Sequence, residues 1–235
     1  MKIMIRNIQT TCMAIALFTL SAAGCRDDTV RPGPLDAPAM PPAAKRDFHY
    51  EFFDQTVKPE DTAAKTNYVN ARIRVAVIKA VTELILTPPV AAFALAIHTT
   101  PVLEADGSFL WTYDHVQGID TSRIRLRGKP AGDHVVWELR IDSSVTNPSV
   151  ANELWFEGES ELDGNTGFWR FHDFLRDGDP VVARIDWSFA PGDDELVFTD
   201  LSVNPGDRLA FDSTASLRSI TFTDVSENME WFIRW

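Results

Sequence analysis

Cysteine is scarce in this sequence, which has two in 235 residues, Cys12 and Cys25. The chain after residue 25 is therefore free of thiols. A domain built from it cannot be stapled by disulfides, and it cannot hold a zinc ion through two or four cysteines. Its stability must come from a hydrophobic core, and a chain of this length is long enough to bury one.

The sequence also lacks the short motifs that carry common chemistries. It contains no Gly-x-Ser-x-Gly elbow, no phosphate-binding glycine-rich loop, no dinucleotide fingerprint and no HExxH or His-x-His pair. Acidic clusters such as Asp177 with Asp179 fall where hairpin turns are expected, since turns prefer Asp and Gly. The sequence therefore predicts no cofactor and no metal, and it favours a non-catalytic protein over an enzyme.

Positive charge is in short supply, with 22 Lys and Arg against 34 Asp and Glu and a formal net charge of −12. A surface this acidic repels phosphate backbones and anionic headgroups. The composition therefore argues against nucleic acid as a partner.

The apolar stretch near the N-terminus is too short to span a bilayer, which takes about 20 residues. Residues 1–24 instead have the order of a signal peptide: Lys2 and Arg6, then apolar residues 12–20, then small residues. The sequence Ala22-Ala23-Gly24-Cys25 resembles a lipobox, the motif of bacterial lipoproteins. This resemblance implies that Cys25 is acylated, becomes the new N-terminus and anchors the protein to a membrane.

The motif departs from its usual form at Ala22, where Leu is common. The alternative is cleavage after Ala23 by ordinary signal peptidase, which would leave an exported protein with a free cysteine. Arg26 stands where an Asp would, in the enterobacterial sorting pattern, favour retention in the inner membrane. The sequence thus predicts an envelope lipoprotein, with the outer membrane favoured.

A proline-rich segment follows the cysteine. Five prolines within residues 25–46 are separated mainly by small or polar residues, a composition that favours extended polyproline II conformers. At ~3.1 Å per residue, such a segment could hold a domain roughly 60 Å from the anchor. We expect residues 25–46 to form a tether and residues 47–235 to form a single β-rich domain.

The domain is expected to begin with a helical segment at about 61–97, in which apolar residues recur at helical spacing and Pro88-Pro89 breaks the helix. From Phe109 onward, apolar and polar residues alternate in short segments separated by turns rich in Gly, Pro and Asp. About ten strands with short links predict a mainly β (α+β) fold. We expect an antiparallel β-meander, a curved or barrel-like sheet packed against the helical segment.

The same alternation fits an outer-membrane barrel, whose apolar face would meet lipid. Two features argue against that alternative: a polar lumen has no place for the apolar segment 73–97, and a lipid tether would be redundant. A lipid anchor, an early helix and a curved antiparallel sheet together resemble the half-barrel lipoprotein carriers of the bacterial envelope. This resemblance concerns the architecture only, so it assigns a role to no residue.

The candidate binding residues are aromatic and charged. Most of the seven tryptophans alternate with polar residues, which is typical of core packing. Trp155 differs because glutamates alternate with it along its strand, so we expect it on the charged face. An exposed aromatic beside carboxylates can stack on a sugar ring and accept hydrogen bonds from its hydroxyls. The predicted ligand-binding residues are Trp155, Phe168, Arg170 and His172.

These observations predict an envelope lipoprotein that is a non-catalytic binding module for a hydrophobic ligand or a glycan. A hydrophobic ligand would suit an aromatic face beneath the helix, and a glycan would suit the face of Trp155. The alternative is a structural or assembly protein that binds another envelope protein. An enzyme ranks third.

Overall fold

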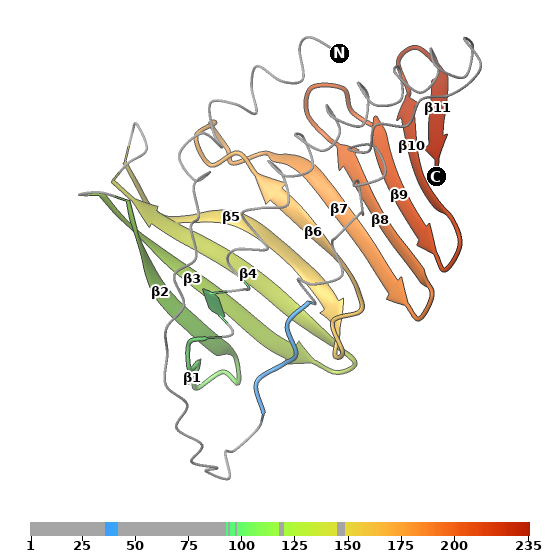
Figure 1. Ribbon diagram of the computed structural model, residues 1–235. Helices are drawn as coiled ribbons and strands as arrows, with labels where there is room; N and C mark the ends of the chain where they lie inside the picture. The colour runs from blue at the N-terminus through green and yellow to red at the C-terminus, as the bar shows by residue number, and fades with distance from the viewer. Residues whose placement is uncertain (1–35, 42–92, 94, 97, 118–119, 145–148) are drawn as a thin grey trace.

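The computed structural model describes residues 36–41, 93, 95–96, 98–117, 120–144 and 149–235. This part of the chain forms one antiparallel sheet of eleven strands, and the order of the strands in the sheet is their order in the sequence. Figure 1 shows the strands running from β1 and β2 at one end of the sheet to β11 at the other. The two end strands, β1 and β11, do not pair with each other, so the sheet is open.

The first strand has two residues, and the other ten have six to twelve residues each. The strands are β1 Val102–Leu103, β2 Phe109–Gln117, β3 Asp120–Ala131, β4 His134–Ser143, β5 Val150–Glu161, β6 Thr166–His172, β7 Val181–Ala190, β8 Asp193–Asp200, β9 Arg208–Thr214, β10 Arg218–Asp224 and β11 Met229–Arg234. The mainly β, antiparallel meander is therefore confirmed.

The helical segment expected at about 61–97 lies almost entirely outside the described residues. Phe93, Leu95 and Ala96 are described, and they are helical. In the described part of the chain, no helix is both long and apolar enough to cross a membrane.

The tight turns fall at the predicted turn signals. Gly132 has a φ of 73° between β3 and β4, and Gly192 has a φ of 81° between β7 and β8. Glycine adopts such positive φ values readily, whereas residues with a Cβ are strained there. These turns fix where the chain reverses, and so they help to fix the register of the strands.

One face of the sheet, the inner face, carries the hydrophobic core. Side chains facing it form rows across the strands, because Cα partners in an antiparallel sheet point the same way. Burial of such apolar surface contributes roughly 25 cal/mol per Å² and is the main force that holds the strands in this order. One buried row runs over five strands through Trp187, Leu196, Phe211, Ile220 and Ile233.

Glycines lie opposite tryptophans on the inner face of the central strands. Trp137 of β4 pairs with Gly128 of β3 on one side and with Gly158 of β5 on the other. A Cβ built on Gly128 would lie 2.6 Å from Cζ3 of Trp137, and one built on Gly158 would lie 2.5 Å from Cε3 of Trp169. The indole rings therefore occupy space that any other residue at these positions would fill.

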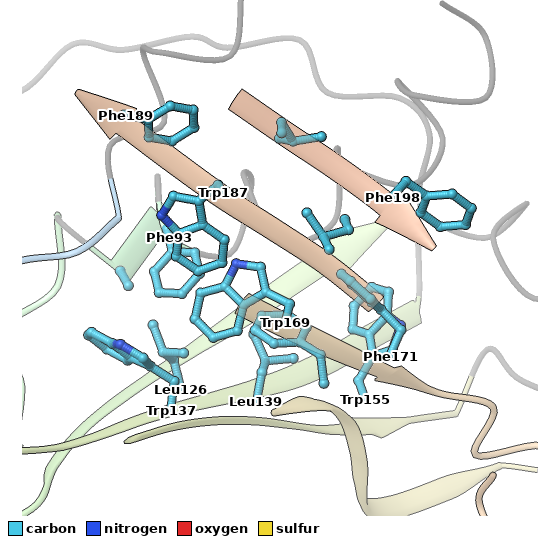
Figure 2. Packing of buried hydrophobic residues seen from close by; sticks show 14 of the residues in the cluster. Phe93, Leu126, Trp137, Leu139, Trp155, Trp169, Phe171, Trp187, Phe189 and Phe198 are labelled. Carbon is cyan, nitrogen blue, oxygen red and sulfur yellow. The ribbon is translucent and has the colours of Figure 1, made fainter. Parts of the chain in front are cut away.

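Phe93 packs into this aromatic layer, as Figure 2 shows. Its ring centroid lies 5.5 Å from that of Trp137 in an edge-on arrangement and 5.2 Å from that of Trp169. Trp169 in turn stacks on Trp187 at 5.1 Å. Phe93 is 1% exposed. The centre of the inner face is thus filled by the protein's own side chains.

Part of the predicted tether, residues 36–41, also lies against the sheet, and we call it the strap. Pro41 is fully buried, and Met40 packs against the core cluster. The contact is at the turn between β5 and β6, where a Cβ built on Gly164 would lie 3.1 Å from the Cα of Pro41. The domain therefore holds this piece of the proline-rich segment.

Replacement of Gly128 by Ala tests the fit between glycine and tryptophan. The added Cβ must displace the ring of Trp137, and overpacking of this kind costs about 1–3 kcal/mol. We expect the free energy of unfolding, measured by urea denaturation, to fall by that amount. In a Trp137→Leu background the same substitution should cost much less, because the smaller side chain leaves room. Equal costs in the two backgrounds would contradict the fit.

Candidate functional site

Trp155 is 8% exposed, so the prediction that it lies on the charged face is wrong. Leu139 pairs with Phe156, whereas the next residue of β4, Arg140, pairs with Leu154. Trp155 is therefore the extra residue of a β-bulge in β5. A bulge adds one residue without a partner and changes which face the side chains beside it occupy. The alternation with glutamates holds along the sequence but not across this bulge.

The indole of Trp155 joins the margin of the core. Its ring meets that of Phe174 edge-on, with the centroids 6.4 Å apart, and lies 6.5 Å from that of Phe156. Phe174 comes two residues after β6 ends and is itself partly buried against the core cluster. Trp155 thus has almost no surface on which a sugar ring could stack.

The other three predicted residues do lie together. Phe168, Arg170 and His172 occupy the face of β6 opposite Trp169 and Phe171, which are buried in the core. We call this second face of the sheet the outer face. The structure therefore brings three of the four candidates to one place and separates Trp155 from them.

Phe168 lies close to two guanidinium groups. The Cζ atom of Arg184 lies 4.2 Å from the centroid of its ring, and that of Arg170 lies 5.0 Å away. Such cation–π contacts contribute about 0.5–1 kcal/mol each at exposed sites. The sequence interpretation missed Arg184, which reaches this place because it is the Cα partner of Arg170 across β6 and β7.

Arg184 has a committed carboxylate partner. Its Nε donates to both carboxylate oxygens of Asp186 at 2.9 Å. This hydrogen bond raises the pKa of the Arg184 guanidinium above its ordinary value, although partial burial works in the opposite direction. The Asp186 carboxylate therefore holds the Arg184 guanidinium in place beside Phe168 and neutralises its charge.

Arg170 is held more loosely. Its Nη1 lies 3.6 Å from Oε1 of Glu157, beyond good hydrogen-bond distance, and its side chain is 44% exposed. The same Oε1 lies 3.7 Å from Nε2 of His172. Arg170 and Glu157 thus present a guanidinium and a carboxylate side by side at the surface.

His172 positions the neighbouring loop. Its Nδ1 lies 2.9 Å from the backbone carbonyl oxygen of Asp179, and a carbonyl can only accept, so Nδ1 is the donor. This contact assigns the hydrogen to Nδ1 and orients Nε2 toward Glu157. The side chain is 11% exposed, so the role of His172 is to hold the loop at Asp179 in place, with little surface of its own for a ligand.

Two arginines of β3 on the outer face are engaged in closer ion pairs. Arg123 donates to Asp114 at 2.9 Å, and Arg125 donates to Asp142 at 2.7 Å. These distances are those of charge-assisted hydrogen bonds, whereas the contact of Arg170 with Glu157 is longer. The contact of Arg170 therefore differs from these two ion pairs of β3. We call the patch formed by Phe168, Arg170, Glu157 and Arg184 the Arg170 patch.

In the described part of the chain, no three His, Cys, Asp or Glu side chains lie close enough together to hold a metal ion. Comparisons of the chain with protein-family models, with curated proteins and with solved structures find no match.

Truncation of Trp155 separates a buried role from an exposed one. We expect Trp155→Ala to lower the free energy of unfolding by about 3–5 kcal/mol, as for a buried aromatic side chain. The matched control Phe168→Ala loses two cation–π contacts at a partly buried position and should cost about 1–2 kcal/mol. Urea unfolding followed by circular dichroism measures both. A loss for Trp155→Ala as small as that of the control would show that the indole is not buried in the bulge.

Proposed function

We propose that the protein is a lipid-anchored, non-catalytic binding module of the bacterial cell envelope, and that it binds a glycan at the Arg170 patch. The observation that carries this proposal is the exposed pairing of Arg170 with Glu157 at 3.6 Å beside Phe168. A guanidinium donates two parallel hydrogen bonds, and a carboxylate accepts two. Adjacent hydroxyls of a sugar ring can therefore accept from one and donate to the other.

A hydrophobic ligand is the less favoured form of this proposal. Such a ligand would use the aromatic inner face, but Phe93 packs between Trp137 and Trp169 at its centre. A ligand would have to displace this side chain and forfeit its contacts. A glycan on the outer face requires no such rearrangement.

The lipid anchor is supported by the signal-like residues 1–24 and by the lipobox-like sequence that ends at Cys25. The strap limits how far the tether can hold the domain from the membrane. Because Met40 and Pro41 contact the sheet, the 14 residues 26–39 between Cys25 and this contact set the longest reach of the anchor, roughly 43 Å at ~3.1 Å per residue. The outer membrane remains the favoured location.

Glycan-array binding of Arg170→Ala tests the patch. We expect the substitution to weaken binding about tenfold or more, because a charged hydrogen bond contributes roughly 1.5–3 kcal/mol. The matched control is Arg123→Ala, which removes an equal charge from the same face where Asp114 already pairs with it. Equal loss in the two variants, or no glycan bound by the unmodified protein, would refute the glycan assignment.

The intact mass of the mature N-terminus tests the anchor. After expression in a bacterial host, we expect an N-terminal peptide that begins at Cys25 and is heavier by a diacylglyceryl group. Cys25→Ala should abolish the added mass and release the protein from the membrane fraction. An unmodified N-terminus at Gly24 would instead establish an exported protein without a lipid anchor.

A second candidate function is a structural or assembly role in which the protein binds another envelope protein. The outer edge of β11 favours it, because no other described strand pairs with that edge and a free strand edge can take up a strand of a partner. A single stable protein partner recovered by crosslinking, together with a silent glycan array, would support this role over glycan binding.

A further inference from the structure

The sheet ends at β11 with an edge that no other described strand pairs with (Figure 1). On its other side β11 pairs with β10, and Arg218 and Trp235 exchange both backbone hydrogen bonds. Hydrogen-bonded pairs alternate along antiparallel strands. The backbone groups of Glu230, Phe232 and Arg234 therefore point away from β10, toward the open edge. Such a row of donors and acceptors is a template for another strand.

The two ends of the sheet are not equally protected. β1 has two residues, and so short an edge offers little to pair with. β11 has six residues, with no proline, no lysine and no bulge against β10 to block the edge, and its two charged residues, Glu230 and Arg234, are of opposite sign. Phe232 is 59% exposed on this strand. A large exposed aromatic at the centre of an open edge favours contact with another molecule.

The side chains of β11 are complementary to a second copy of the same strand. When two copies run antiparallel with Phe232 facing Phe232, Glu230 faces Arg234 of the second copy, and Arg234 faces its Glu230. No other antiparallel register sets these opposite charges against each other. The remaining facing pairs in this register are apolar, Trp231 with Ile233 and Met229 with Trp235.

The backbone phase permits the same register. The residues that face each other across the axis, Phe232 with itself and Glu230 with Arg234, are those whose N–H and C=O groups point to the open edge. They would form the hydrogen-bonded pairs of the new ladder. The backbone phase thus allows several registers, and the facing charges of Glu230 and Arg234 single out this one.

We propose that β11 pairs with β11 of a second copy of this chain, antiparallel about a two-fold axis at Phe232. The two open sheets then join into one continuous sheet. The interface is isologous, as in most homodimers, because each copy uses the same strand. Facing charges of opposite sign and facing aromatics are the pairs that stabilise antiparallel strands.

Sedimentation velocity tests the proposal on the purified protein carrying Cys25→Ser, so that no lipid drives association. We expect a monomer–dimer equilibrium that Glu230→Arg weakens about tenfold or more, because it sets two guanidinium groups against each other at both symmetry-related positions. The double variant Glu230→Arg/Arg234→Glu should restore the dimer. The control Glu161→Arg makes the same change in net charge on β5 and should leave the dimer unchanged. A protein that stays monomeric, or a dimer indifferent to Glu230→Arg, overturns the proposal.

A thiol at the axis tests the register. In a background with Cys12→Ser and Cys25→Ser, Phe232→Cys places two new thiols on facing residues, whose Cα atoms lie about 5.5 Å apart in a hydrogen-bonded pair. That separation suits a disulfide, so mild oxidation should crosslink the dimer. Thr223→Cys on β10 should not crosslink. A crosslink at Thr223 without one at Phe232 overturns the proposed register, and neither outcome bears on glycan binding at Arg170.

Discussion

Trp137 lies between two glycines of neighbouring strands, and much of the domain depends on this fit. With no Cβ at Gly128, the indole can settle against the backbone of β3, and its Nε1 donates to Oγ of Ser160 at 2.9 Å. The missing Cβ of Gly158 leaves room for the backbone of Phe168 and the ring of Trp169. Phe93 then packs edge-on against the ring of Trp137. A slip of one residue between these strands would place side chains where the rings must lie, so the fit of ring to glycine adds specificity to a register that alternation alone leaves open.

The two faces of the described part of the sheet differ in how much surface they leave for other molecules. The inner face is filled by aromatic rings that contact each other, which leaves it as a core and not a surface. The outer face carries many charged side chains, and Arg123 and Arg125 of β3 are closely paired with aspartates. Within the described residues, the Arg170 patch and the edge of β11 are the two places at which we propose binding. Binding at either place would leave the core undisturbed.

The sequence predicts the meander well because its signals are local. Alternation places Trp137 and Ile185 on the inner face, and turn residues mark the reversals. Trp155 was misplaced because a bulge breaks the alternation, although three large apolar residues in succession, Leu154-Trp155-Phe156, are a sign of it. The contact of Arg184 with Phe168 depends on the register between β6 and β7, which no local sequence pattern encodes. The signal peptide, the acylation of Cys25 and the helix at 61–97 stay predictions.

Because each described strand pairs with the strands next to it in the sequence, the sheet is nearly a one-dimensional array. Stability in such an array is close to a sum over neighbouring units, and order can spread from one hairpin to the next without closing long loops. Opening then begins at the ends, where a strand has a single neighbour. The sheet would unzip from β1 or from β11, and the aromatic layer of β4–β7 would open last. A strand bound along β11 would act as a cap, slowing the opening from that end and leaving the opening from β1 unchanged.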